Sequence, residues 1–393
     1  MNSVSATRDL RIDALRGLLL VIMAAVHVPT PLSHFFQEPA GYVSAAEGFI
    51  FIGACMAGWV YGRTYQRQGW NAMSRRSWDR AFQIYSLHLA LLLPAVLIAW
   101  VLAPVLPPLA NHFHGFLEHP RTSLLLIPAL LHQPPLFDIL PLYIVFLGIT
   151  PLLLACARHS GWGKIIAISG LAWLAAQIHL ESRLFGAAPN WLPACGGSFN
   201  LLAWQVLWVA GLAVGETTTR RAIFPARHRL LLTRISGAVV ALGLLSRHGL
   251  WPRELFSPDL YLWMDKWTLG PLRLLNFSAW VVLLLSWSPQ PPRWLAGPLA
   301  LPGRHSLSVF ALHVPLAIVA TAAIETCSLS GAFQVVLGLL IIAALFLWAG
   351  WLEQQARRRQ QPVAVRPDVD VAVPASLPVA SGERWPEATA AVS

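Results

Sequence analysis

Charged side chains are scarce in this chain of 393 residues, because only 12% of the residues are charged whereas 56% are hydrophobic. Soluble domains carry about 25% charged residues, so the composition argues against a soluble globular protein. Apolar runs of about 17 to 22 residues recur, and each is long enough to cross a bilayer as a helix. The alternating pattern of a membrane barrel is absent. We therefore expect an all-α integral membrane protein.

Cysteine and the common catalytic motifs are also poorly represented. The four cysteines show no CxxC spacing, so neither a zinc site nor a redox motif is indicated, and a disulfide between Cys195 and Cys327 is not favoured. No GxSxG, Walker or GxGxxG motif stands in a usable context, which removes support for a serine hydrolase or a nucleotide-driven pump. Scattered histidines in the loop 111–133 are more typical of solvated side chains than of metal ligands, so no metal is expected.

Ten segments qualify as candidate transmembrane helices. They are approximately 12–28, 44–62, 81–103, 138–157, 163–180, 200–216, 232–247, 268–287, 306–325 and 331–352. The first carries charges and lacks a cleavage site, so we expect it to remain rather than to be removed as a signal peptide.

The net charge of +10 does not indicate nucleic acid, because most Lys and Arg residues fall in alternate loops. Basic clusters occur at 63–80, 220–234 and 357–359, whereas the other side carries only Arg121, Arg183, Arg253 and Lys266. Cytoplasmic loops collect positive charge, so both termini are predicted to be cytoplasmic. Residues 1–355 would form one multi-pass domain, and the Pro- and Ala-rich segment 356–393 a disordered cytoplasmic tail.

The first predicted helix holds the most informative polar residues, because charged groups inside a span usually face a cavity or a partner. Arg16 and His27 are eleven residues apart, which places them on one helical face about 16 Å apart along the axis. Asp13 precedes Arg16 by three residues and is close enough for an ion pair. The alternative is that Arg16 snorkels to the interface while His27 lies among headgroups.

Glu47 lies roughly one turn inside the outer end of the second span, at about the depth of His27. A carboxylate paired with His27 would fix its tautomer and raise its basicity, as a general base requires. Glu47 could instead be a helix N-terminal carboxylate stabilised by the helix dipole. The small residues Gly53 and Gly58 further along this span favour close packing on a neighbouring helix.

Four later spans contribute weaker candidates. Asp138 lies at the outer end of the fourth span, where an N-cap role would also explain it. Asn200 and Gln205 lie at the outer end of the sixth span, Arg273 lies inside the eighth, and His313 inside the ninth.

Six separated motifs resemble the OpgC proteins of osmoregulated periplasmic glucan biosynthesis, within the acyltransferase-3 superfamily. They are "RDLRIDALRGLLLVIMAAVH", "AAEGFIFIGACMAGWVYGR", "FDILPLYIVFL", "FNLLAWQVLW", "DKWTLGPLRLLNF" and "GRHSLSVFALH", within residues 7 to 350. The Arg-X10-His pattern of that superfamily falls on Arg16 and His27. Ser44 and Leu201 stand where relatives carry an acidic residue and a proline, which leaves the acyl group and the acceptor open.

The resemblance implies an acyl-CoA-dependent O-acyltransferase of the bacterial inner membrane that acylates an extracytoplasmic glycan, with succinyl as the acyl group in the named branch. Acyl-CoA would be a cosubstrate, and no permanently bound cofactor is expected. Arg16, with Arg11, would hold the phosphates of coenzyme A, while His27, oriented by Glu47, would deprotonate the acceptor hydroxyl. Asp13, Asp138, Asn200, Gln205, Arg273 and His313 would support the substrates. A homodimer is left open.

Two other classes of function compete with this interpretation. A transporter or flippase could line a substrate path with the same buried charges, although the inverted repeat that would support it is not evident. An accessory subunit of glucan synthesis could use the charges as packing pairs.

Overall fold

The computed structural model describes residues 9–180, 198–217, 226–249, 262–287 and 290–360, and within these ranges it is helical apart from turns and loops. The helices are α1 (Leu10–His27), α2 (Ser33–Gln37), α3 (Ala45–Leu102), α4 (Pro107–His112), α5 (His114–Glu118), α6 (Pro120–Leu126), α7 (Ile139–Ser160), α8 (Trp162–Gln177), α10 (Leu201–Thr217), α11 (Ala226–Arg247), α13 (Pro271–Trp287), α14 (Arg293–Arg304), α15 (Ser306–Thr326) and α16 (Gly331–Gln360). The expected all-α class is confirmed over this part of the chain.

Each of the ten predicted spans lies on a helix. Among the described residues, five helices, namely α3, α7, α11, α15 and α16, are long and apolar enough to cross a membrane. α1 is as long as a short span but carries three charged residues, and α10 and α13 are shorter apolar helices. The count of ten spans and the side on which the termini lie stay predictions. Cys195 and the tail beyond residue 360 lie outside the described residues, and α16 itself runs five residues past the predicted domain boundary.

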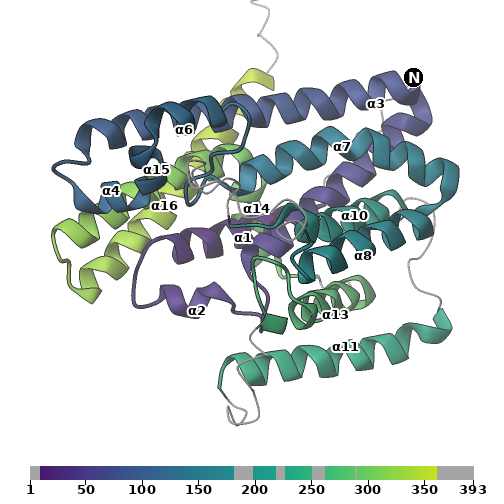
Figure 1. Ribbon diagram of the computed structural model, residues 1–393. Coiled ribbons are helices and arrows are strands. Elements are labelled where there is room, and N and C mark those ends of the chain that lie inside the picture. The colour runs from purple at the N-terminus through teal and green to yellow at the C-terminus, as the bar shows by residue number, and fades with distance from the viewer. Residues whose placement is uncertain (1–8, 181–197, 218–225, 250–261, 288–289, 361–393) are drawn as a thin grey trace, which may run out of the picture.

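Two predicted spans belong to the single long element α3, which crosses the top of Figure 1. The basic segment 63–80, predicted as a loop, is helical, and its only non-helical residue is Gly69 (φ 81°, ψ −174°). That segment is rich in Arg and Gln, which favour helix, and Gly69 accepts the positive φ without a Cβ penalty. The loop prediction was wrong because charge patterning reports the side of the membrane and not the backbone conformation.

Small residues let helices approach until backbone touches backbone. A Cβ atom added to Gly58 of α3 would collide with the carbonyl of Leu212 on α10, and one added to Gly215 with the carbonyl of Cys55. The close packing predicted for the second span is therefore confirmed. α1 meets α14 in the same way, because a Cβ on Gly17 would collide with the Leu299 carbonyl.

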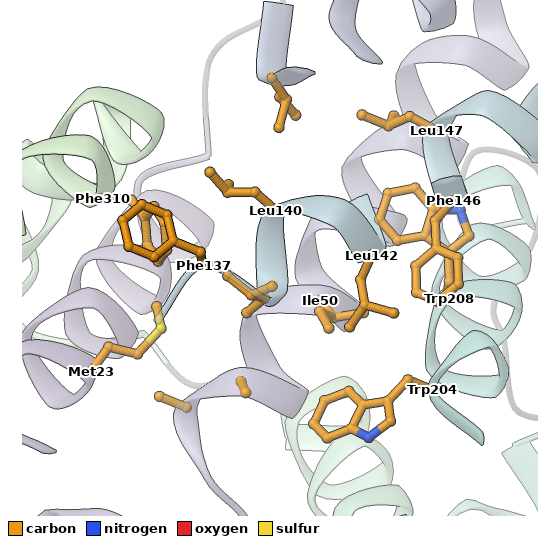
Figure 2. Close-up of a cluster of buried hydrophobic side chains, with 14 of the residues drawn as sticks. Met23, Ile50, Phe137, Leu140, Leu142, Phe146, Leu147, Trp204, Trp208 and Phe310 are labelled. Atoms are coloured by element: carbon orange, nitrogen blue, oxygen red, sulfur yellow. The ribbon is translucent and has the colours of Figure 1, made fainter. Parts of the chain in front are cut away.

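The main core lies where α3, α7 and α10 meet, as Figure 2 shows around Ile50, Leu142 and Trp208. The Trp208 ring packs against Phe146 with 5.5 Å between centroids. Its indole nitrogen donates a hydrogen bond of 3.0 Å to Thr150 Oγ1, so burial of this large side chain leaves no unpaired donor.

α11 lies along the lower edge of the view in Figure 1 and presents apolar side chains outward, among them Leu230, Leu231 and Ile235. So extensive an exposed apolar surface is costly in water and is what a lipid-facing helix requires.

The contact between α1 and α14 generates a prediction about stability. A Cβ on Gly303 would collide with the Asp13 carbonyl, whereas one on Gly297 of the same helix would meet open space. Gly303→Ala should therefore destabilise the protein by about 1–3 kcal/mol through overpacking. Gly297→Ala should be neutral or slightly stabilising, because alanine is the better helix former. Thermal unfolding of the detergent-solubilised variants measures the difference, and equal melting temperatures would contradict the packing described.

Candidate functional site

α1 carries its two functional candidates at opposite ends. The Asp9 carboxylate caps its first turn by accepting the backbone N–H of Arg11 at 2.9 Å, and the helix ends at His27 because Val28 is extended ahead of Pro29. Arg16 and His27 are therefore held on one continuous helix about 16 Å apart.

A cavity of about 230 Å³, here called the basic cavity, opens at the Arg16 end of α1. It is lined by Arg16, Arg80, Gln83, Arg304, His305, Ser306, Leu307 and Ser308. Three guanidinium groups from three different helices, α1, α3 and α14, thus meet in one small space. Planar guanidinium groups suit bidentate recognition of phosphate oxygens, so this cavity fits a polyphosphate.

Neighbouring polar groups hold the arginines of the basic cavity. Arg16 donates to the Ser306 hydroxyl, and Arg80 donates to Gln83 Oε1 at 2.5 Å. Arg304 lies 3.9 Å from the buried Asp13 carboxylate and 3.2 Å from Glu353. The Asp13 carboxylate therefore helps to hold the Arg304 guanidinium in the cavity wall.

Arg11 is placed differently from its predicted role. Its guanidinium makes two hydrogen bonds to Asp9, of 3.0 and 2.8 Å, and it does not line the basic cavity. The hydrogen bond from Arg11 also lowers the pKa of the Asp9 carboxyl. This arginine belongs to the N-terminal cap of α1.

A second cavity, here called the histidine cavity, opens at the other end of α1 and also has a volume of about 230 Å³. Its polar lining is His27, Gln37, Ser44, Asp138, Ser198 and Lys266. Its apolar lining includes Met23, Phe199, Trp267 and Phe310. Apolar walls with a few convergent polar groups are typical of small-molecule sites.

His27 meets His313 of α15 at the histidine cavity. Nδ1 of His27 lies 3.0 Å from Nε2 of His313, and the rings stack with 4.9 Å between centroids and 25° between planes. The sequence had placed His313 among the supporting residues without a partner, and the structure brings it into direct contact with the predicted base.

The predicted pairing of Glu47 with His27 is wrong. One Glu47 oxygen accepts the backbone N–H of Ser44 at 3.0 Å and also its hydroxyl, and the other accepts Arg273 Nη1 at 2.5 Å. Glu47 is fully buried and Arg273 is 2% exposed, so each charge neutralises the other in a setting where isolation would be costly. The capping alternative is realised in part, because Ser44 and Glu47 form a capping box at the start of α3.

Arg273 therefore belongs to a group of ion pairs with Glu38 and Glu47, here called the ion cluster, and does not line the histidine cavity. Arg273 also donates to the Met264 carbonyl at 3.1 Å, while Arg247 binds Glu38 at 2.7 Å. Sequence reasoning missed Glu38. The signal available was that an arginine inside a span needs carboxylates near its depth, and Glu38 and Glu47 are the two acidic residues that follow α1.

The remaining candidates divide between the cavity and helix packing. Asp138 lines the histidine cavity and accepts the Ser198 N–H at 3.2 Å instead of capping α7. Asn200 Oδ1 accepts the Ala203 N–H at 3.0 Å at the start of α10, and Gln205 bonds Ser169 of α8. Neither amide belongs to the cavity lining, so neither is placed as an oxyanion donor.

Three cations of the cavities, namely Lys266, Arg80 and Arg304, were not selected as site residues from the sequence. Lys266 lines the histidine cavity, with its ammonium 5.0 Å from the centre of the Trp267 ring, and Arg80 lines the basic cavity. Lys266 stood out as one of few basic residues on the sparsely charged side. Arg80 was hidden among the other arginines of 63–80.

Over the described residues, these features define a helical membrane protein with a cavity at each end of α1. A family model described as "OpgC protein" matches residues 8–357, and the chain belongs to this family. No curated protein and no solved structure matches the chain.

The ion cluster leads to a test of what Glu47 does. Removing one partner of a buried pair costs about 3–5 kcal/mol, so Glu47→Ala should lower the melting temperature and the yield of folded protein. Glu118→Ala is the control, since the Glu118 side chain is 55% exposed and should have little effect. A Glu47→Ala protein of unchanged stability that had lost activity would instead place Glu47 in the chemistry.

Proposed function

We propose that the protein is an inner-membrane O-acyltransferase that moves an acyl group from cytoplasmic acyl-CoA to a hydroxyl of an extracytoplasmic glycan such as periplasmic glucan. Membership of the OpgC family supports a glucan-modifying acyltransferase. The observation that carries the proposal is the pair of cavities at the two ends of α1, one lined by three arginines and the other by His27.

In this proposal the donor enters from the basic cavity, which faces the cytoplasm. Arg16, Arg80 and Arg304, which are half-buried, attract the phosphates of coenzyme A through charge-assisted hydrogen bonds. The pantetheine arm then runs beside α1 towards His27. The axial separation of about 16 Å is comparable to the extended length of that arm.

The chemistry takes place in the histidine cavity. His27 accepts the proton of the glycan hydroxyl through Nε2 while the hydroxyl oxygen forms a bond to the thioester carbonyl carbon. The tetrahedral intermediate collapses, the carbon–sulfur bond breaks, and the departing coenzyme A sulfur receives the proton from His27. The products are an ester on the glycan and free coenzyme A, and no redox partner is required.

The cavity lining suits both substrates. Asp138 offers a carboxylate to sugar hydroxyls, and the Trp267 ring, which is 44% exposed, offers an apolar face to a sugar ring. A dicarboxylic acyl group such as succinyl needs a cation near its free carboxylate. Lys266 fills that need, because Arg273 is already committed to two glutamates.

The first experiment is mass spectrometry of periplasmic glycans from cells lacking the protein, complemented with wild type or with His27→Ala at matched membrane abundance. Wild type should restore an acyl mass increment, which also identifies the acyl group, whereas His27→Ala should not. Full restoration by His27→Ala would refute the mechanism. Glycans unaffected by loss of the protein would favour the transporter or the accessory subunit.

The basic cavity can be tested separately with the purified protein. Arg16→Gln should raise the KM for acyl-CoA about ten-fold or more, since hydrogen bonds between charged groups contribute about 1.5–3 kcal/mol. Arg75→Gln is the matched control, because the Arg75 side chain is 86% exposed and does not line the basic cavity. An unchanged KM in Arg16→Gln would remove the phosphate site from this cavity.

A further inference from the structure

We infer that His313 is the positioning residue of the reaction: its Nε2 accepts the Nδ1 hydrogen of His27 and so leaves the Nε2 lone pair of His27 facing the acceptor. This inference rests on the proposed function, in which His27 is the base. The sequence predicted that the Glu47 carboxylate orients His27. In this inference the His313 imidazole does so.

The contacts of His27 leave one group to fill this role. Among the described residues, the only hydrogen-bond partner of the His27 ring is His313, at 3.0 Å. Glu47 is held by Arg273 and Ser44, and Asp138 accepts the Ser198 N–H. His27 lines the cavity whereas His313, 1% exposed, does not. A substrate in the cavity therefore contacts His27 and not His313.

The arrangement of the ring nitrogens determines what each imidazole can do. A neutral imidazole has one donor and one acceptor nitrogen, so the short contact requires one hydrogen between Nδ1 of His27 and Nε2 of His313. If His27 donates that hydrogen, its Nε2 is an acceptor and can take a proton; if His313 donates it, His27 Nε2 already carries hydrogen. General-base catalysis is available only to the first arrangement.

The same contact stabilises the charged intermediate. Once His27 has taken the substrate proton, its ring is an imidazolium whose Nδ1 hydrogen still points at His313. A hydrogen bond from a charged donor is roughly twice as strong as a neutral one, so the interaction strengthens as the proton moves. His313 needs no proton of the substrate for this and remains neutral throughout.

Packing keeps His313 in place. Phe310, one turn earlier on α15, lies 5.6 Å from the His313 ring centre, and the ring stacks on His27 from the other helix. Replacement by glutamine keeps a side-chain oxygen near the position of Nε2, whereas leucine fills a similar volume without an acceptor. The two variants separate the hydrogen bond from the packing.

The test measures transfer from acyl-CoA to glucan by purified wild-type protein and by His27→Ala, His313→Leu, His313→Gln and His88→Leu. His88 is the matched control, since it is fully buried, packs beside Phe137 and does not line the histidine cavity. We expect His313→Leu to lower kcat at least about ten-fold with KM nearly unchanged, because the lost interaction acts on the transition state. His313→Gln should recover most of the rate, and His88→Leu should behave as wild type.

The outcomes separate the two proposals. Inactive wild-type protein, or an active His27→Ala variant, overturns the proposed function. If those two behave as expected, an unimpaired His313→Leu variant, a His313→Gln variant as slow as His313→Leu, or a His88→Leu variant equally slow overturns the positioning role alone. Nitrogen-15 NMR of labelled histidine gives an independent readout: His27 should carry hydrogen on Nδ1 in the wild type and lose that preference in His313→Leu, and hydrogen on Nε2 in the wild type would also overturn it.

Discussion

The paired charges of Arg273, Glu38 and Glu47 organise the part of the molecule that surrounds His27. A guanidinium buried to this depth is tolerated only with carboxylates beside it, so the three groups must be brought together during folding. Meeting that requirement joins α13 to the start of α3 and to the segment after α1. These are the elements that carry Ser44 and Gln37 into the wall of the histidine cavity.

In the proposed reaction, the same cluster determines which group lies beside the base, His27. Because Glu47 is occupied by Arg273, the carboxylate usually expected beside a catalytic histidine is missing from the contacts of His27. A neutral imidazole partner avoids placing an additional negative charge in an apolar cavity whose lining already contains Asp138. Because Glu47 neutralises Arg273, the hydrogen-bond partner of His27 is the imidazole of His313 and not a carboxylate.

Local sequence patterns were sufficient to predict the all-helical class and the positions of the long apolar helices, because hydrophobic length and period are properties of each segment alone. The shared face of Arg16 and His27 followed from helical spacing in the same way. The pairing of Glu47 with Arg273 could not be predicted from helical spacing. It depends on the rotation of α13 about its own axis, which places Arg273 at the start of α3. Lys266 and Arg80 were equally hidden, because a cavity wall is assembled from helices distant in sequence. The helical state of 63–80 was missed although its Arg and Gln residues favour helix, because the pattern of basic charge indicates only the side of the membrane.

One consequence of the backbone contact between α1 and α14 concerns mechanics. A transporter that works by alternating access must rock one group of helices against another. Here α1 contributes to both cavities and is locked to α14 at Gly17 and Gly303, where no side chain separates the two backbones. On the basic side, the Ser77 hydroxyl and the Trp78 indole of α3 donate to consecutive carbonyls of α7, at 2.8 and 3.1 Å. Helices joined in this way resist sliding past one another, so under the proposed function the donor moves along α1 while the helices keep their places.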